Sequence, residues 1–487
     1  MKSFLFWIYA VCYSKIFFAR NPLKSQKKTL SKIIQNLNAT QYQKAFSEDL
    51  IVNSEDFFSK IPVSDYENLQ PFIEKILNGD QNVFCQNSIK YMLLSSGTTS
   101  GAKYIPITKE GISYQIRGAK LVLILYALHK KNASFMKHFM IFLQGSPQLD
   151  IQNSIPAGRL SGVVYHEVPK FFQKNKLPSY EVNIIEDWIL KINAIVDETK
   201  SKDISIIGGI PPWCIQYFEA LLKEKQVNNL KSIFPNLELY IHGGVDFSPY
   251  RSKVKKLLGN EVVCLDTFPA SEGFFAIQDH PEADDMLLLT DNGIYYEFRE
   301  VGGLETISLE NVKTNVVYEL IISNLSGFYR YAIGDLVCFT SVLPYRIQVA
   351  GRVQHFISAF GEHVIAHHIE SVMSSFIEFL NIEINDFHVC PDVSNKQYLW
   401  FIEAELNEKL KINQKQYESF LDLELSKKNS YYKHLIEGEI IQQCQIIWLK
   451  SGSFETYRIE NKKLGAQNKV VHLSNNIEIG KWFLNQI

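Results

Sequence analysis

Apolar residues recur at helical spacing in two early parts of the chain, and short apolar runs follow further on. The helical spacing covers residues 30–37 and 112–123, and Thr108 precedes the second stretch as a predicted N-cap. The apolar runs at 204–207 and 237–241 are typical of buried strands, and each leads to a pair of glycines. This alternation predicts an α/β fold, and open α/β sheets bind ligands at the carboxyl ends of their strands.

The pattern changes to a compact α+β order after Arg352. Before that point, Tyr91 to Leu94 and 262–265 are predicted strands, and Ser248-Pro249 is the predicted start of a helix. The later elements are expected to be a helix over 369–380, strands at 387–389 and 398–404, a helix over 414–436 and a strand over 440–449. We therefore predict a large N-terminal domain with mixed sheets and helices over residues 1–351, and a small mobile α+β domain over 352–487.

The N-terminal segment has a lysine followed by an apolar run, a pattern that is also found in signal peptides. Its uncharged run from Ser3 to Ser14 is shorter than the ~20 residues that span a bilayer, and Lys15 interrupts it. We therefore predict a packed N-terminal helix and expect no membrane partner, while contact of this apolar segment with a membrane stays open.

Charge and cysteine usage narrow the class of protein. The 487 residues are 46% hydrophobic and 21% charged, with a net charge of -2, so the chain lacks the basic field that attracts nucleic acid. Seven cysteines lie far apart without a CxxC pair, which favours a reducing compartment and a cytoplasmic location. His363, His367 and Glu370 share one face of a predicted helix, but nothing else in the sequence completes a zinc site.

The first segment that carries chemistry is the loop of small residues at 94–103, Leu-Ser-Ser-Gly-Thr-Thr-Ser-Gly-Ala-Lys. Hydroxyls, backbone N–H groups and one lysine are suited to phosphate oxygens. It is not a Walker loop, because Gly97 and Gly101 are one residue too close and Tyr104 follows the lysine. A polar surface loop is the alternative. The candidate phosphate contacts are Ser95, Ser96, Thr98, Thr99 and Lys103.

The second segment is Asp-Thr-Phe-Pro-Ala-Ser-Glu-Gly at 266–273. An aromatic such as Phe268 can stack on a flat base, and the carboxylate of Glu272 can hold Mg²⁺. Pro269 stands where the GxSxG elbow of serine hydrolases needs glycine, so the sequence argues against an esterase.

Two further segments follow at 327–335 and 350–352. Asp335 comes directly after Gly334, and an aspartate held in this way can accept hydrogen bonds from both hydroxyls of a ribose. Arg352 places a guanidinium at the predicted domain boundary.

The order and separation of these segments resemble the core motifs of the adenylate-forming superfamily. The closest likeness is to the acyl-acid amido synthetases of the auxin-responsive promoter family and their bacterial relatives, and the chain is similar to a bacterial-type member. The signs are Ser-Ser-Gly-Thr-Thr-Ser-Gly-Ala-Lys at 95–103, Phe-Pro-Ala-Ser-Glu-Gly at 268–273 and Phe-Tyr-Arg-Tyr-Ala-Ile-Gly-Asp at 328–335. Segments at 421–432 and 463–469 extend the resemblance over nearly the whole chain.

The resemblance implies ATP and Mg²⁺ as cofactors and a set of roles for individual residues. The phosphates would be contacted by Ser95, Ser96, Thr98, Thr99 and Lys103. Adenine would lie against Phe268, Gly243 and Gly244, and Ser271 would also contact the nucleotide. Glu272 would bind Mg²⁺ and Asp335 would bind the ribose. Arg352 would lie at a hinge, and Lys469 or Lys463 would be the catalytic lysine of the mobile domain, beside Lys103 and Glu272. Gln354 and the Val470-Val471 pair after Lys469 depart from the usual pattern.

The sequence therefore predicts a ligase that activates a carboxylic acid as its acyl-AMP and transfers the acyl group to an amine, with an amino acid as the expected acceptor. An acyl-CoA ligase with the same first step is one alternative. A nucleotide-binding sensor without catalysis is the other.

Overall fold

The computed structural model describes residues 2–96, 102–168, 173–353, 356–357, 359–360, 364–405, 413–461, 471–475 and 477–486. The chain divides into two units. The N-terminal unit comprises Met1–Val245, Val254–Ile333 and Cys338–Gln348, and the C-terminal unit comprises Asp246–Lys253, Gly334–Val337 and Val349–Ile487.

A long mixed sheet forms the centre of the N-terminal unit. Its parallel part has the order β6, β3, β7, β8, β9, and the strands that continue it from β9 to β10 and β11 are antiparallel. In sheet order the strands are β13 (Thr306–Ser308), β12 (Ile294–Glu300), β14 (Val317–Asn324), β15 (Tyr331–Val342), β16 (Tyr345–Arg352), β11 (Met286–Leu288), β10 (Gly273–Ile277), β9 (Val263–Ala270), β8 (Leu239–Gly243), β7 (Ile204–Gly208), β3 (Phe139–Phe142) and β6 (Lys176–Leu177).

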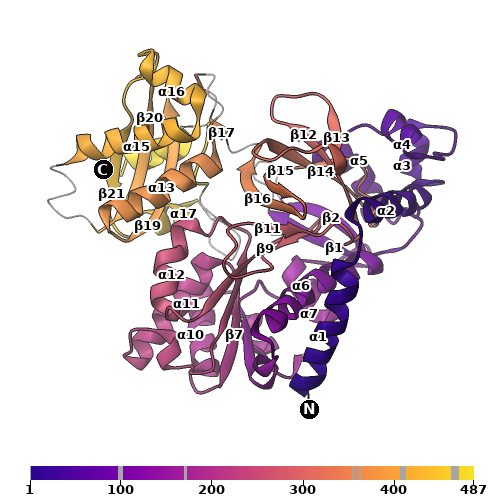
Figure 1. Ribbon diagram of the computed structural model, residues 1–487, viewed down its shortest axis with the longest axis horizontal. Helices are drawn as coiled ribbons and strands as arrows, with labels where there is room; N and C mark the ends of the chain where they lie inside the picture. Colours follow the sequence, from indigo (N-terminus) through magenta and orange to yellow (C-terminus); the bar gives the residue numbers. More distant parts are fainter. Residues whose placement is uncertain are drawn as a thin grey trace. The chain divides into compact units, whose positions relative to one another are not determined.

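Helices cover both faces of the parallel part of this sheet (Figure 1). On one face α6 (Lys109–Lys130) packs Leu121 and Leu125 against Ile206, Leu239 and Leu265 of the strands. On the other face lie α10 (Trp188–Thr199) and α11 (Pro211–Lys225). The predicted N-cap of α6 is confirmed, because the Thr108 hydroxyl accepts a hydrogen bond from the Gly111 amide at 3.1 Å.

A smaller sheet has the order β2, β1, β5, β4. Strand β1 (Ile89–Ser96) contains the predicted strand Tyr91 to Leu94 and forms an antiparallel hairpin with β2 (Ala102–Thr108). The sheet is completed by β5 (Ile155–Gly158) and β4 (Asp150–Gln152). The two described ends of the glycine-rich motif, residues 95–96 and 102–103, therefore lie on paired strands.

Short helices complete the N-terminal unit, and α1 (Lys2–Phe18) confirms the predicted packed N-terminal helix. The others are α2 (Pro22–Leu37), α3 (Gln41–Phe46), α4 (Ser54–Lys60), α5 (Tyr66–Leu77), α7 (Leu160–Glu167) and α9 (Tyr180–Asn183), with 3₁₀ turns η1 (Ser134–Lys137), η2 (Leu230–Ser232) and η4 (Leu309–Asn311).

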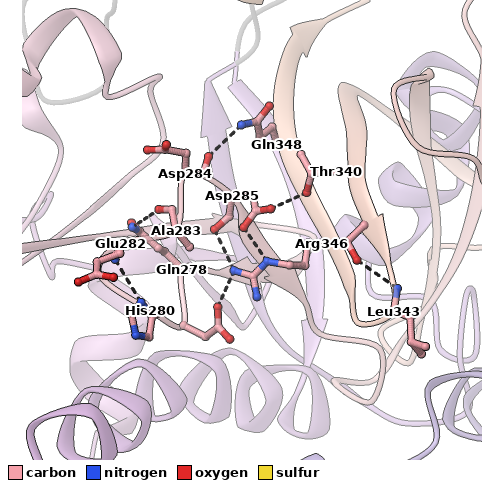
Figure 2. Close-up of polar contacts among 12 residues, drawn as sticks. Gln278, His280, Glu282, Ala283, Asp284, Asp285, Thr340, Leu343, Arg346 and Gln348 are labelled. Carbon is pink, nitrogen blue, oxygen red and sulfur yellow. Dashed lines mark hydrogen bonds and ion pairs between the residues drawn. The ribbon is translucent and has the colours of Figure 1, made fainter.

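A cluster of ion pairs around Arg346 fixes the loop between β10 and β11 to β16 (Figure 2). The Arg346 guanidinium donates to Asp285 at 2.6 Å and to Asp279 at 2.7 Å, and the Thr340 hydroxyl donates to Asp285 at 2.5 Å. Gln348 adds a bond to the Asp284 carbonyl at 3.0 Å. The last residues of the N-terminal unit are thus held firmly.

The C-terminal unit is built on a sheet of β19 (Ile384–Asp392), β20 (Gln397–Ala404) and β21 (Gln445–Leu449). Helices α13 (Ala366–Leu380), α15 (Gln414–Lys428) and α16 (Ser430–Glu437) bury one face of the sheet around Trp400 and Phe376. Helices α17 (Ser453–Glu460) and α18 (Glu478–Leu484) pack on the other face around Phe401. A short pair, β17 (Phe356–Ile357) and β18 (Val364–Ile365), precedes α13.

Four predicted elements differ in detail from the structure. The strand predicted over 440–449 is confined to β21, because its pairing with β20 begins only at Gln445. The helix predicted over 414–436 breaks at Asn429, whose backbone is extended. The Asn429 side chain caps α16 by accepting a hydrogen bond from the Tyr432 amide at 2.8 Å. Ser248-Pro249 lies in the 3₁₀ turn η3 (Ser248–Tyr250), and α12 (Arg251–Leu258) begins only after it. Strand β9 runs on to Ala270 instead of ending near Leu265, because its pairing with β10 extends it.

Candidate functional site

The predicted metal and adenine residues lie on the hairpin of β9 and β10. Phe268 is a strand residue whose ring lies edge-on to Phe275, with 5.0 Å between the ring centroids. Ser271 and Glu272 form the turn between the paired residues Ala270 and Gly273. The hairpin thus places the aromatic ring in the strand and the carboxylate at its tip.

Two amide side chains hold this turn by its main chain. Asn324, at the end of β14, donates from Nδ2 to the Glu272 carbonyl at 2.9 Å. Gln115 of α6 donates from Nε2 to the Ala270 carbonyl at 2.8 Å. Sequence reasoning missed both residues, although an asparagine directly before a glycine turn is a recognisable signal. The turn is therefore held through its main-chain carbonyls.

A small cavity lies beside the turn. Its lining includes Tyr114, Gln115, Ser271, Glu272, Asn324 and Ser326. Ile107, Ile294 and Leu325 complete the lining together with glycines, so polar and apolar groups share it about equally.

The end of β8 is bare of side chains where it runs alongside β9. Gly243 pairs with Thr267, and a Cβ on Gly243 would lie 2.3 Å from the Thr267 carbonyl oxygen, so only glycine fits there. Gly244 follows in the left-handed region at φ +78. Phe268 is the next residue after Thr267. The structure thus brings Gly243, Gly244 and Phe268 together at neighbouring strand ends, as the sequence predicted for a nucleotide base.

The described residues of the phosphate motif lie at the end of β1 and the start of β2. Ser95 is paired with Lys103, and the Lys103 ammonium lies 4.8 Å from the centroid of the Tyr66 ring. Such a cation–π contact orients the lysine side chain. Ser96 ends β1, whereas Thr98 and Thr99 lie outside the described residues.

Hydrogen bonds connect this hairpin to the β9–β10 turn. At the end of β2, the Thr108 amide donates to the Ser326 hydroxyl at 3.2 Å. The Ser326 amide in turn donates to the side-chain oxygen of Asn324 at 2.9 Å, and Asn324 holds Glu272. The phosphate and metal motifs are therefore linked through residues 324–326.

Most of the Phe-Tyr-Arg-Tyr motif is structural. Arg330 is buried with a left-handed backbone at φ +50, and its guanidinium binds both Glu297 carboxylate oxygens and the carbonyls of Phe58 and Ile61. The Tyr329 hydroxyl donates to a buried backbone carbonyl at 2.6 Å. These residues therefore attach the start of β15 to helix α4 and to the segment around Phe84.

Asp335 and Arg352 are brought together in the C-terminal unit. The Asp335 carboxylate is buried and accepts a hydrogen bond from Arg352 Nε at 2.6 Å. The Gly334 carbonyl accepts from the Val353 amide at 2.8 Å, and Gly334 has a left-handed φ of +79. The predicted ribose ligand is thus oriented by the predicted hinge arginine.

The two candidate catalytic lysines, Lys463 and Lys469, lie outside the described residues. The residues on either side of that segment are both attached to Asp386 on β19. Arg458 contacts one carboxylate oxygen at 3.3 Å and His472 Nε2 contacts the other at 3.3 Å. One carboxylate therefore holds both flanks of the stretch in which the lysines occur.

His472 is also bonded through Nδ1 to Glu370 on α13 at 3.1 Å. Burial by itself lowers the pKa of His472, but the carboxylates of Asp386 and Glu370 outweigh it and raise the pKa to about 10. Burial, together with Asp246, raises the pKa of Glu370 to about 7. Sequence reasoning missed His472 because its partners are distant along the chain.

The donor set suits one hard cation bound together with phosphates. Among the described residues, no group of three or more His, Cys, Asp or Glu side chains could hold a metal on its own. Mg²⁺ needs no such cage, because it is commonly bound by one or two carboxylates plus substrate phosphates and water. Glu272 at the hairpin tip fits that requirement. Of the residues considered for zinc, His363 is not described, and His367 lies 3.9 Å from Asp246.

Comparison with known families identifies three matching stretches. The GH3 family N-terminal domain matches residues 16–189, the GH3 family central domain matches residues 287–352 and the GH3 family C-terminal domain matches residues 367–478. The matches occur in chain order and cover most of the sequence.

Curated relatives are plant enzymes of low identity. Jasmonoyl–L-amino acid synthetase JAR4 of Nicotiana attenuata is 23% identical over 384 residues, which is 64% of this chain and 66% of that protein. Indole-3-acetic acid-amido synthetase GH3.4 of Arabidopsis thaliana is 25% identical over 392 residues, 66% of this chain and 65% of that protein. The alignments thus span just under two thirds of the relatives' length.

Solved structures share the fold over nearly the whole chain. A GH3.15 acyl acid amido synthetase superposes with a TM-score of 0.78 at 17% identity, covering 95% of this chain and 93% of that one. A 2-hydroxyisobutyryl-CoA ligase in the postadenylation state superposes with a TM-score of 0.62 at 12% identity, covering 96% and 90%. The fold is that of GH3 proteins and of adenylate-forming enzymes more widely.

Proposed function

The chain belongs to the GH3 family, and from this premise we propose that it is an ATP-dependent ligase that joins a carboxylic acid to the amino group of an amino acid. AMP and pyrophosphate are released. The observation that carries the proposal is the match of all three GH3 family domains in order along the chain. Relatives named as amido synthetases of jasmonic and indole-3-acetic acid support the substrate classes. We also propose a cytoplasmic location, on the ground that the seven cysteines lie far apart without a CxxC pair.

We assign the nucleotide to the residues that the sequence singled out. The bare strand end at Gly243 and Gly244, next to Phe268, suits the flat face of adenine. The buried Asp335 carboxylate, oriented by Arg352, suits the ribose hydroxyls. Ser95, Ser96, Thr98, Thr99 and Lys103 would bind the phosphates, with Ser271 beside them.

Glu272 would hold Mg²⁺, which supplies positive charge to the triphosphate when bound. Its carboxylate lies on a turn whose main chain is already held by Asn324 and Gln115. These main-chain bonds fix the position of the residue that would carry the cation.

In the proposed first step, a carboxylate oxygen attacks the α-phosphorus. A new P–O bond forms, the bond to the bridging oxygen breaks and pyrophosphate leaves. Lys103 and one lysine of the tail, Lys469 or Lys463, offset the negative charge that builds on the phosphate oxygens. The Tyr66 ring keeps the Lys103 ammonium in one place for this role.

In the proposed second step, an uncharged amine attacks the carbonyl carbon of the acyl-AMP. The C–N bond forms, the bond from the carbonyl carbon to the phosphate oxygen breaks, AMP leaves and the amine releases a proton. We propose that the domain of residues 352–487 moves relative to residues 1–351 between the two steps, with Arg352 at the hinge. Such a movement excludes water from the reactive anhydride.

An acyl-CoA ligase is the second candidate, favoured by the likeness to 2-hydroxyisobutyryl-CoA ligase. Its TM-score of 0.62 is below the 0.78 of the amido synthetase, so we rank it second. A nucleotide sensor without catalysis is the third possibility.

The test is an acid-dependent ATP–pyrophosphate exchange assay over a panel of carboxylic acids, followed by AMP release with amino acids or CoA. Exchange with one class of acids, and AMP release that depends on an amino acid, are the expected results. Release that depends on CoA would select the second candidate. Nucleotide binding without exchange over the whole panel would select the sensor.

A further inference from the structure

Helix α1 is apolar around its whole circumference. Its sequence is KSFLFWIYAVCYSKIFF, in which only Lys2 and Lys15 are charged. A helix of this kind is normally buried on all sides or lies in contact with lipid. In this protein it is neither fully buried nor long enough to cross a bilayer: none of the described helices is long and apolar enough to do so.

One side of α1 is firmly docked on the N-terminal unit. Ala10 is fully buried, and Phe6 lies edge-on to Phe135 with 6.1 Å between ring centroids. The Tyr13 hydroxyl accepts a hydrogen bond from Arg117 Nε at 2.9 Å. These contacts lie along the length of the helix, so α1 stays attached to the unit by one side. Its other side is available to a partner. Figure 1 shows α1 lying along α6 at the margin of this unit.

The other side of α1 exposes large apolar side chains. Their exposed fractions are 63% for Phe4, 57% for Leu5, 40% for Ile8, 47% for Tyr9, 60% for Ile16 and 59% for Phe18. Residues 5, 8, 9, 12 and 16 follow the i, i+3, i+4 spacing of one helix face, with exposed Cys12 among them. No other described helix exposes so many large apolar residues, and a contiguous patch of this kind marks an interaction surface.

The charge around α1 indicates what covers this face. Residues 1–47 contain no Asp or Glu, while the whole chain has a net charge of -2. The basic residues of this stretch are Lys2, Lys15, Arg20, Lys24, Lys27, Lys28, Lys32 and Lys44. Lys15 on α1 and Lys24, Lys27, Lys28 and Lys32 on α2 are exposed, and Arg20 pairs with Asp291. The apolar face is therefore accompanied by positive charge without any nearby acidic residue in sequence.

We propose that the exposed face of α1, together with the lysines of α2, is a docking surface for an anionic lipid bilayer. The helix lies in the interfacial plane, with Leu5, Ile8 and Ile16 in contact with acyl chains. Apolar side chains flanked by lysines are the composition of helices that bind the surface of anionic membranes. A second copy of the chain fits less well, because it would bring two strongly basic segments together. This inference does not depend on the proposed ligase activity.

The test is flotation of the full chain with vesicles of phosphatidylcholine that contain about 30% phosphatidylserine, an anionic lipid that makes the vesicle surface negative. The wild type is expected to float with these vesicles. A triple variant, Leu5→Glu, Ile8→Glu and Ile16→Glu, is expected to lower the partition coefficient at least about tenfold. The matched control is Leu304→Glu with Leu343→Glu, which changes residues that are 93% and 90% exposed elsewhere on the same unit and should float like the wild type.

A charge series separates the apolar and electrostatic contributions. Replacing Lys24, Lys27, Lys28 and Lys32 by Gln should lower binding to the anionic vesicles by about fivefold per lysine near the surface, and added salt should have the same effect. Binding to pure phosphatidylcholine should not change with these replacements. Thermal unfolding and pyrophosphate exchange of each variant show whether the fold and the site are intact.

The proposal is wrong if the wild type stays with the soluble fraction at low salt, or if the triple variant floats as the wild type does. It is also wrong if sedimentation shows a wild-type dimer that the triple variant converts to a monomer while neither binds vesicles, since the face is then an interface between copies. A fluorophore on Cys12, in a Cys264→Ser and Cys338→Ser background, gives an independent reading. Its emission should shift to the blue with anionic vesicles and stay unchanged if the helix faces water.

Discussion

Arg352 Nε donates to Asp335 Oδ1 at 2.6 Å, so the last residue of β16 fixes the orientation of a buried carboxylate on β15. Arg352 is about half exposed, whereas Asp335 is almost fully covered. A carboxylate group that is buried in this way needs hydrogen-bond partners from the protein or from a ligand. The pair thus preorganises the group that we assign to the ribose.

Asp335→Ala should therefore weaken ATP binding. Charge-assisted hydrogen bonds contribute about 1.5–3 kcal/mol each, so the dissociation constant should rise by more than about tenfold. Isothermal titration calorimetry with ATP and Mg²⁺ measures this change. Arg352→Gln is the comparison, because it keeps the carboxylate and loosens only its orientation. An Asp335→Ala variant that is folded and binds ATP like the wild type would remove this residue from the site.

Glu272→Gln should abolish Mg²⁺-dependent pyrophosphate exchange without unfolding the protein. A glutamine oxygen is a poorer ligand than a carboxylate for a hard cation. The hairpin should remain, because Asn324 binds the Glu272 main-chain carbonyl and not its side chain. Glu300→Gln, at the exposed end of β12, is the control and should exchange normally. Exchange by Glu272→Gln with the wild-type rate and Mg²⁺ dependence would exclude the metal role.

Arg330→Met should destabilise the N-terminal unit without acting on nucleotide binding directly. It leaves the buried Glu297 carboxylate without its partner, and breaking a buried ion pair on one side costs about 3–5 kcal/mol. Urea unfolding followed by intrinsic fluorescence measures the loss. The double variant Arg330→Met with Glu297→Gln should be more stable than the single one. If both are equally unstable, the pairing is not the source of the effect.

His472 should make stability depend on pH in the alkaline range. The raised pKa of about 10 means that the folded protein keeps a proton that the unfolded chain releases above its ordinary pKa of about 6.5. The contribution is complete below about 6.5 and is lost as the pH rises to about 10. Glu370 has the same sign, but the rise of its pKa to about 7 confines its effect to lower pH.

Between pH 7.5 and 9 the wild type should lose up to about 1.4 kcal/mol per pH unit more than His472→Gln does. Chemical unfolding across this range gives the slopes. His472 contacts Glu370, Asp386 and the ring of Phe387. The titratable groups around them include Arg458, Asp246, Tyr250, His367 and His388, and none of these is altered in this variant. His434→Gln, on an exposed part of the same unit, is the control. Equal slopes in the wild type and His472→Gln would refute the role of the carboxylate pair.

Lys469→Ala should suppress acyl-AMP formation by roughly 10²–10³-fold, the scale of losing one preorganised electrostatic group. It should still convert supplied acyl-AMP to amide at a near-normal rate, because the lysine acts only while charge builds on phosphorus. Lys463→Ala is the paired variant. A defect in Lys463→Ala alone would move the catalytic role to that residue, and normal adenylation by both would exclude a lysine of this segment.

The sequence was sufficient where function and structure depend on neighbours along the chain. Thr108 caps α6 because the capping bond joins residues three apart, and Gly243 can be recognised as a strand-end residue because a short apolar run precedes it. The order of the motifs was enough to identify the family, since that order does not depend on how the chain folds.

The tertiary structure decided the contacts between distant segments. Arg330 lies in the motif at 327–335, which the sequence singled out for Asp335. Its bonds to Glu297 and to the carbonyls of Phe58 and Ile61 show that it is a structural residue. Strand β9 continues through Pro269 because β8 ends opposite Thr267, so the missing N–H of proline leaves no bond of that ladder unmade. Local propensity could not supply that information.

The same limit applies to the residues that hold the site. Asn324 supports Glu272 from 52 positions away, and His472 meets Glu370 across 102 positions. Hydrophobic pattern and local motif determine which elements form and which chemistry they carry. Which side chains fix those elements in place depends on sheet order and helix packing, and these arise only when the whole chain has buried its core.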